Sequence, residues 1–218
     1  MDRKMRYKAA IFDLDGTLVD SLTDLADATN YALAMFGQPC RNLQAFRQMV
    51  GEGTKTLISR ALEPDKQHFL EKVLEKMREK YAKICLNKTK PYKGLPQVIG
   101  ELAKKSVKLA VLTNKDQKMA ERIVNYFFDS YFDIIAGATA SIAVKPDPTQ
   151  TLQIVDKFKL KPQEAVFIGD SNIDMQTAKT CKMFAVGVSW GLGSIEELKE
   201  NGADIIIDRS KKLLEIFN

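Results

Sequence analysis

The feature that most constrains the fold is a repeated alternation of short apolar runs with longer segments of helical spacing. The apolar runs have the length of β-strands and occupy residues 8–12, 108–112, 132–136, 165–168, 184–188 and 204–207. Helical patterns separate the later runs, at residues 117–127, 149–158, 174–180 and 195–200. Strands and helices that alternate in this way build βαβ units around a parallel sheet. We therefore predict an α/β fold whose core is a Rossmann-like, doubly wound parallel sheet with helices on both faces.

The segment between the first two strands departs from this alternation, because it is far longer than one crossover helix requires. Apolar residues recur with helical spacing over residues 22–36 and again over residues 69–84. Ser21 and Asp24 stand at the positions of a capping box before the first of these helices. We predict a helical cap domain inserted into the core. The expected division gives residues 1–18 and 87–218 to the core and residues 19–86 to the cap, with linkers at 17–20 and 87–94.

Composition excludes several broad classes of protein. The 218 residues are 45% hydrophobic and 28% charged, as in an ordinary globular protein long enough to bury a core. No apolar run approaches the ~20 residues that span a bilayer, and the apolar stretch after the basic residues 1–8 is too short for a signal peptide. We therefore expect no membrane partner and a cytoplasmic location. The three cysteines form no metal-binding or disulfide pattern.

The net charge of +5 raises the question of nucleic-acid binding. The lysines are spread over predicted helices, and no basic run is interleaved with aromatic residues. We expect no nucleic-acid partner. A mild positive field suits a small, negatively charged ligand equally well.

Polar residues with the chemistry of a site follow the first predicted strand. Asp13 and Asp15 lie two residues apart and are followed by Gly16 and Thr17. In open parallel sheets, ligands bind beyond the carboxyl ends of the strands. Two carboxylates supply oxygen ligands for a hard cation such as Mg²⁺, and the glycine lets backbone N–H groups approach an anion. An Asp-Gly turn without function is the alternative at this stage.

Three further clusters fall after other predicted strands. Thr113 and Asn114 follow the second strand and are either neutral donors for phosphate or a helix N-cap. Lys145 stands before a proline, which keeps that residue out of a helix. Asp170 and Asp174 occupy the turn and the first helical turn after a strand, where they can bind metal; Asp174 can instead complement the helix N-terminus.

The order Asp-x-Asp-Gly-Thr, Thr-Asn, Lys-Pro, Gly-Asp-x-x-x-Asp resembles the haloacid dehalogenase-like hydrolase superfamily. The resemblance implies a phosphatase in which Asp13 forms an aspartyl-phosphate and Asp15 acts as acid and base. It also implies that Asp13, the backbone carbonyl of Asp15, and Asp170 hold Mg²⁺, with Asp174 in support. The phosphoryl group would be bound by Thr113, Asn114 and Lys145.

Finer similarity favours the phosphoglycolate phosphatase-like branch of the superfamily. Residues 49–62 look like the cap loop of those enzymes, in which Gly51 and Gly53 would let the loop approach the substrate. Glycines between helices are also ordinary C-caps. If the substrate carries a carboxylate, Arg47, Lys55 or Arg60 of the cap are the candidates to bind it.

Other functions remain open from the sequence. The same covalent step serves a sugar-phosphate mutase, similar to β-phosphoglucomutase, and a pyrophosphatase can use the same fold. A catalytically silent binding module is the alternative outside the enzymes. We expect a small phosphorylated metabolite as the partner and a monomer or homodimer as the assembly.

Overall fold

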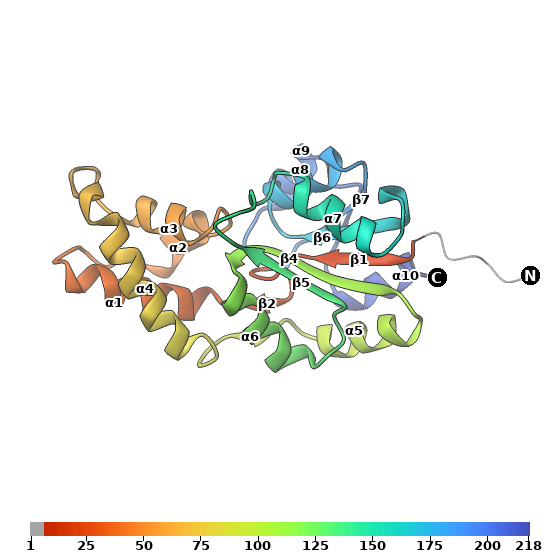
Figure 1. Ribbon diagram of the computed structural model, residues 1–218, viewed down its shortest axis with the longest axis horizontal. Helices are drawn as coiled ribbons and strands as arrows, with labels where there is room; N and C mark the ends of the chain where they lie inside the picture. The colour runs from red at the N-terminus through yellow and green to blue at the C-terminus, as the bar shows by residue number, and fades with distance from the viewer. Residues whose placement is uncertain (1–6) are drawn as a thin grey trace, which may run out of the picture.

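The computed structural model describes residues 7–218, in which helices cover a central sheet and a second group of helices projects from one end (Figure 1). The sheet consists of β1 (Ala9–Phe12), β4 (Lys108–Asp116), β5 (Ile134–Ala138), β6 (Ala165–Gly169), β7 (Phe184–Val188) and β8 (Ile205–Ile207). All neighbouring strands of this sheet pair in parallel. The predicted α/β fold with a parallel, Rossmann-like core is confirmed.

Residues of each central strand alternate between two hydrophobic cores. Ala10 and Phe12 of β1 contribute to one core, whereas Ala9 and Ile11 contribute to the other. This follows from the two-residue period of a strand, and explains why buried strands read as continuous apolar runs. The first core is covered by α5 (Leu95–Lys104), α6 (Gln117–Phe128) and α10 (Leu213–Ile216), and the second by α7 (Thr149–Lys157), α8 (Asn172–Thr180) and α9 (Ile195–Glu200).

The strand order places a ligand crevice beside β1. The order across the sheet is β5-β4-β1-β6-β7-β8, so the chain turns to one side after β1 and to the other from β6 onward. In such sheets, ligands bind outside the carboxyl ends of the strands where the direction reverses. Asp13 follows β1 at this point of the sheet.

The projecting helices come from the long segment between β1 and β4. They are α1 (Leu22–Met35), α2 (Leu43–Met49), α3 (Thr54–Ala61), the 3-10 helix η1 (Pro64–Phe69) and α4 (Leu70–Ile84). Leu33 of α1, Phe46 of α2 and Met77 of α4 are fully buried among them. We call residues 19–86 the cap and the remainder the core. That division stays a prediction, and residues 1–6 of the predicted core lie outside the described residues.

Cap and core are joined by two neighbouring chain segments. β2 (Val19–Asp20) and β3 (Lys90–Pro91) pair antiparallel, with Asp20 opposite Lys90. The fully buried carboxylate of Asp24 ties the same segments together. It accepts hydrogen bonds from the backbone N–H of Lys88 at 3.0 Å, and from the N–H and hydroxyl of Thr89 at 2.8 Å each.

The capping box predicted for Ser21 and Asp24 is wrong. Ser21 is the N-cap of α1, but its side chain makes no capping hydrogen bond. Its hydroxyl donates instead to the Asp15 carboxylate, and Asp24 is engaged by the second linker. Both side chains therefore hydrogen-bond to residues outside α1 instead of capping the helix.

The remaining differences from the expected elements are small. The strand predicted over residues 108–112 continues to Asp116, with a register shift between Leu112 and Asp116. Two short 3-10 helices, η2 (Pro162–Glu164) and η3 (Ser210–Lys212), complete the core. Within residues 7–218, no helix is both long and apolar enough to cross a membrane.

Candidate active site

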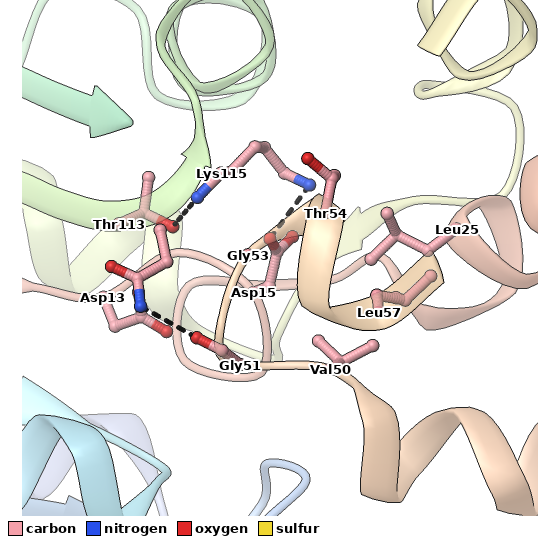
Figure 2. A pocket seen from close by; sticks show the side chains of 11 residues that line it. Asp13, Asp15, Leu25, Val50, Gly51, Gly53, Thr54, Leu57, Thr113 and Lys115 are labelled. Atoms are coloured by element: carbon pink, nitrogen blue, oxygen red, sulfur yellow. Dashed lines mark hydrogen bonds and ion pairs between the residues drawn. The ribbon is translucent and has the colours of Figure 1, made fainter. Parts of the chain in front are cut away.

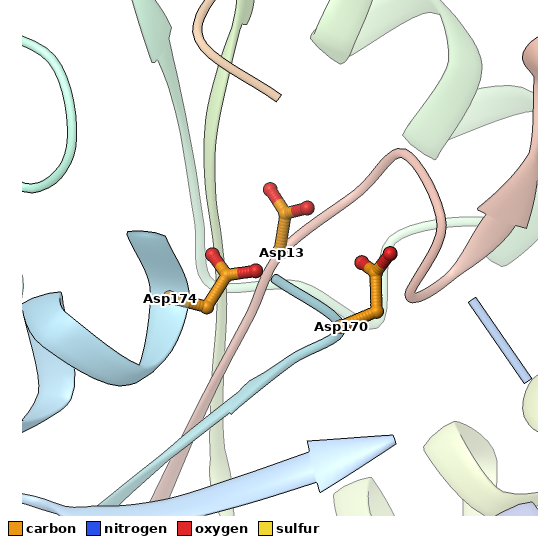
Figure 3. Close-up of side chains that lie close together, drawn as sticks. All are labelled: Asp13, Asp170 and Asp174. Carbon is orange, nitrogen blue, oxygen red and sulfur yellow. The ribbon is translucent and has the colours of Figure 1, made fainter. Parts of the chain in front are cut away.

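Three buried carboxylates meet at the carboxyl ends of β1 and β6. Oxygen atoms of Asp13, Asp170 and Asp174 lie within 4.8 Å of one another. Figure 3 shows the three side chains close together. Asp13 and Asp170 follow the two adjacent strands, and Asp174 lies in the first turn of α8. A cluster of carboxylate oxygens is the ligand type that hard cations prefer. These three residues could hold a metal ion.

Hydrogen bonds fix two of these carboxylates in place. Asp170 accepts from the Thr17 hydroxyl at 2.7 Å and from the backbone N–H of Leu192 at 2.8 Å. Asp174 accepts from the hydroxyl of Ser171 at 2.6 Å, and the Ser171 hydroxyl in turn caps α8. Two interpretations of Asp174 were open from the sequence, a metal ligand or a partner of the helix N-terminus. The position of Asp174 fits both, because the residue complements the N-terminus of α8 and also faces the cluster.

Gly16 is required by the close packing around Asp170. Its φ is +89°, a backbone conformation that residues with a side chain rarely adopt. A Cβ atom at this position would lie 2.2 Å from Oδ2 of Asp170. The Asp-Gly step after β1 therefore allows the first loop to pass directly against the acidic cluster.

The crowding of negative charge favours a bound cation. Burial, with the Asp174 and Asp170 carboxylates adding to it, raises the pKa of Asp13 against the opposing charge of Lys145. Burial and the neighbouring Asp174 likewise raise the pKa of Asp170. A divalent cation between them would supply the missing positive charge, so the donor set and its electrostatics both fit a metal site.

Lys145 is the cationic member of the cluster. Its Nζ lies 2.7 Å from Oδ1 of Asp13 and 2.6 Å from Oδ1 of Asp174. Burial opposes the charge of this side chain, but the two carboxylates raise its pKa above the usual value. Asn114 holds the backbone of Lys145 from both sides, since it accepts from the Lys145 N–H at 2.9 Å and donates to the carbonyl at 3.0 Å.

A small cavity of about 40 Å³ lies between Asp13, Asp15 and the cap loop. Figure 2 shows Thr113 on its core side and Gly51 and Gly53 on its cap side. Asn114 of the core donates to the Gly51 carbonyl of the cap at 3.0 Å. The structure thus brings the predicted residues Thr113, Asn114, Gly51 and Gly53 to Asp13 and Asp15.

Lys115 is a site residue that sequence reasoning missed. Its Nζ lies 2.9 Å from Oδ2 of Asp15 and donates to the hydroxyl of Tyr81, on α4 of the cap, at 3.0 Å. Lys115 and Thr113 are two residues apart on β4 and line the same cavity. Its position directly after Thr113 and Asn114, near the carboxyl end of β4, was the available signal.

The three cap cations lie in different surroundings. Arg47 donates to the backbone carbonyl of Gly191 at 2.9 Å and, with Arg60, lines a cavity of about 470 Å³ that also reaches Asp13 and Asp15. Arg60 pairs with Glu52. Lys55 pairs with Glu71 and lines another cavity that does not include Asp13.

Comparison with known proteins gives one consistent result. Residues 10–188 match the family described as haloacid dehalogenase-like hydrolase. The phosphoglycolate phosphatase of Pseudomonas putida is 31% identical, over 95% of this chain and 78% of its own length. The phosphoglycolate phosphatase of Haemophilus influenzae is 30% identical, over 97% of this chain and 99% of its own. A solved structure of a predicted phosphoglycolate phosphatase from Haemophilus somnus is 27% identical, with a TM-score of 0.91 over 99% of this chain and 100% of that one.

Proposed function

The chain belongs to the haloacid dehalogenase-like hydrolases, and on that premise we propose that it removes phosphate from 2-phosphoglycolate or a close analogue. The protein is a phosphatase, as the resemblance implied. The observation that carries the proposed reaction is Asp13 at the sheet crevice, beside Lys145 and the Asp170–Asp174 pair. The substrate class rests on the names of the relatives.

In the first step, an oxygen of Asp13 attacks phosphorus while the bond from phosphorus to the ester oxygen breaks. This forms an aspartyl-phosphate and divides the hydrolysis into two displacements. Asp15 gives its proton to the departing alkoxide and later takes one from the water that attacks the phosphoenzyme. The water then releases inorganic phosphate and restores the Asp13 carboxylate.

The surrounding residues position and neutralise the phosphoryl group. Lys145, held by Asn114, offsets negative charge as the phosphoryl group is transferred, and Thr113 offers its hydroxyl to the same oxygens. The expected cofactor is Mg²⁺, held by Asp13, Asp170 and the Asp15 carbonyl with Asp174 in support. When bound, it would reduce the repulsion between the nucleophile and the phosphate.

Arg47 is the cap residue that we propose to bind the substrate carboxylate. Lys55 and Arg60 are each paired with a glutamate of the cap, whereas the contact of Arg47 is with a backbone carbonyl. Arg47 therefore has charge to offer to a ligand in the cavity that reaches Asp13. A carboxylate on the leaving group would complete that interaction.

A panel of phosphate esters tests the proposed function. We expect phosphate release from 2-phosphoglycolate in the presence of Mg²⁺, and none after addition of a chelator. Glucose 1-phosphate and pyrophosphate serve as comparison substrates. Conversion of the sugar phosphate without release of free phosphate would favour a mutase. Preferred hydrolysis of pyrophosphate would favour a pyrophosphatase. A pure, folded protein that turns over none of these substrates would favour a binding module. The cytoplasmic location and the monomeric or homodimeric state stay predictions.

A further inference from the structure

The boundary between cap and core contains a buried cation that the proposed reaction leaves without a role. The side chain of Lys115 is 2% exposed, and its Nζ lies within hydrogen-bonding distance of one group from each part of the molecule. The core supplies Asp15, which it contacts at 2.9 Å, and the cap supplies the hydroxyl of Tyr81, at 3.0 Å. A buried lysine is costly unless it is paired, so these contacts are requirements of the site and not incidental ones.

Lys115 and Ser21 together determine where the Asp15 carboxylate points. Ser21 donates to Oδ1 of Asp15, and Lys115 contacts Oδ2. Figure 2 shows the Lys115 amine reaching Asp15 beside Thr54, at the start of α3. With both oxygens engaged, the carboxylate has one orientation, which faces the cavity that it shares with Asp13.

Tyr81 makes this arrangement depend on the position of the cap. It is buried on α4, and the Nζ of Lys115 also lies 4.6 Å from the centroid of its ring. Burial raises the pKa of Tyr81, despite the opposing charge of Lys115, so the group stays a neutral hydroxyl that can accept from the amine. Movement of the cap away from the core would remove both the hydroxyl and the ring from Lys115.

We propose that Lys115 is the positioning residue for the acid-base carboxylate Asp15, and that Tyr81 makes this positioning conditional on cap closure. The inference rests on the proposed phosphatase reaction. When the cap is closed, Lys115 is held by Tyr81 and in turn holds Asp15 toward the ester oxygen. The proton moves from Asp15 to that oxygen as its bond to phosphorus breaks and the bond from Asp13 to phosphorus forms.

The dependence of the rate on the leaving group distinguishes this role from a structural one. An alkoxide needs a proton to leave, whereas p-nitrophenolate leaves without one. The ratio kcat/KM reports the steps up to formation of the phosphoenzyme, and so excludes the later role of Asp15 toward water. Misplacement of Asp15 should therefore lower kcat/KM for ethyl phosphate and spare p-nitrophenyl phosphate.

The experiment compares wild type with Tyr81→Phe and Lys115→Met on these two esters and on 2-phosphoglycolate, with Mg²⁺ present. General acid catalysis contributes roughly 100- to 10,000-fold, so we expect Lys115→Met to lower kcat/KM for ethyl phosphate by about 100-fold. Tyr81→Phe keeps the aromatic ring and should lose about 10-fold. Loss on p-nitrophenyl phosphate should stay below about 3-fold for both. Asp15→Asn provides the reference pattern, and thermal unfolding checks that each variant is folded.

Arg78→Gln is the matched control. Arg78 lies one turn before Tyr81 on α4 and also reaches the core, through two 3.0 Å hydrogen bonds to Asp116. These hydrogen bonds involve neither Asp15 nor Lys115, so the loss of Arg78 should change kcat/KM for both esters equally.

Two results would overturn the inference. One is an equal loss on both esters for Lys115→Met and Tyr81→Phe, which would mark a general effect on cap docking. The other is a loss confined to 2-phosphoglycolate, which would make Lys115 a ligand of the substrate carboxylate. Failure of the proposed function would look different, because wild type would then release phosphate from no ester, and the inference would fall with it.

Discussion

At the scale of single residues, each of the two central carboxylates is paired with a buried lysine. Lys145 contacts Asp13 and Lys115 contacts Asp15, and all four side chains lie between the cap and the carboxyl ends of the strands. The two lysines come from different segments, so each carboxylate has a cationic partner of its own. This separation suits a nucleophile and an acid-base group, which need different environments although they are two residues apart.

Asp13→Asn should abolish phosphate release without weakening the fold. Loss of a covalent nucleophile costs on the order of 10⁴- to 10⁶-fold in kcat. Because burial and the neighbouring carboxylates raise the pKa of Asp13, a negative charge at this position costs free energy in the folded protein. A neutral amide avoids that cost and can still accept from Lys145. Phosphate release and urea unfolding, measured together, check both parts; activity near wild type would contradict the assignment of the nucleophile.

Arg47→Gln should weaken binding of 2-phosphoglycolate and leave esters without a carboxylate unaffected. The lost charge-assisted hydrogen bonds correspond to a rise in KM of roughly 10- to 100-fold. Steady-state kinetics on 2-phosphoglycolate and ethyl phosphate measure the difference. Lys55→Gln is the control, because Lys55 pairs with Glu71 outside the Asp13 cavity and its loss should alter neither KM. A larger effect from Lys55 would reverse the proposal.

At the scale of elements, the sequence predicted the strands and helices whose apolar residues form runs or recur with a regular spacing. Buried strands such as β6 and β7 appear as apolar runs because both of their faces are covered, and their bounds agree to within one residue. β2 and β3 have two residues each, too few to show a period. The predicted capping box failed because Asp24 is held by the second linker, which is 64 residues away in sequence.

The residues of the candidate site also fall into those that the sequence could predict and those that it could not. Asp13, Asp170 and Asp174 follow predicted strands, so the order of strands was enough to bring them together. The contact between Lys115 and Tyr81 joins a strand to a cap helix and depends on how the two parts dock. No pattern within either segment encodes that relation, which is why the sequence did not reveal it.

Asp24→Ala should destabilise the junction between the two parts. The substitution leaves the buried backbone N–H of Thr89 and the part-buried N–H of Lys88 without their acceptor. We expect a decrease of roughly 3 kcal/mol in the free energy of unfolding, measured in urea. Asp24→Asn retains one acceptor oxygen and should lose less. Equal stability of Asp24→Ala and wild type would show that the hydrogen bonds of Asp24 do not stabilise the linkers.

At the scale of the whole molecule, several polar contacts close the cap over the crevice. The loop between α2 and α3 accepts from Asn114 through Gly51, and α4 reaches the core through Arg78 and Tyr81. Of the residues in these contacts, Gly51, Asn114 and Lys115 line the cavity that contains Asp13 and Asp15. Closure of this kind excludes water at the wrong moment and completes the catalytic set.

Mg²⁺ should raise the stability of the whole protein, because the buried carboxylates lack sufficient positive charge without it. A ligand at 100 times its Kd adds about 2.7 kcal/mol to the free energy of unfolding if it binds only the folded state. Thermal unfolding with and without Mg²⁺ measures this gain. Asp170→Asn removes one ligand and should lose most of the gain. A melting temperature that is independent of Mg²⁺ in wild type would contradict the metal assignment.

The pairing of β2 with β3 has a consequence for how such a molecule can be altered. Since Asp20 and Lys90 lie opposite each other on adjacent strands, the chain leaves and re-enters the sheet domain at almost the same place. A short hairpin could bridge those ends, or a different set of helices could be spliced there, without moving the strands that carry the aspartates. The inserted helices can therefore be exchanged as one unit that changes substrate preference, provided that the new helices again supply a partner for Lys115.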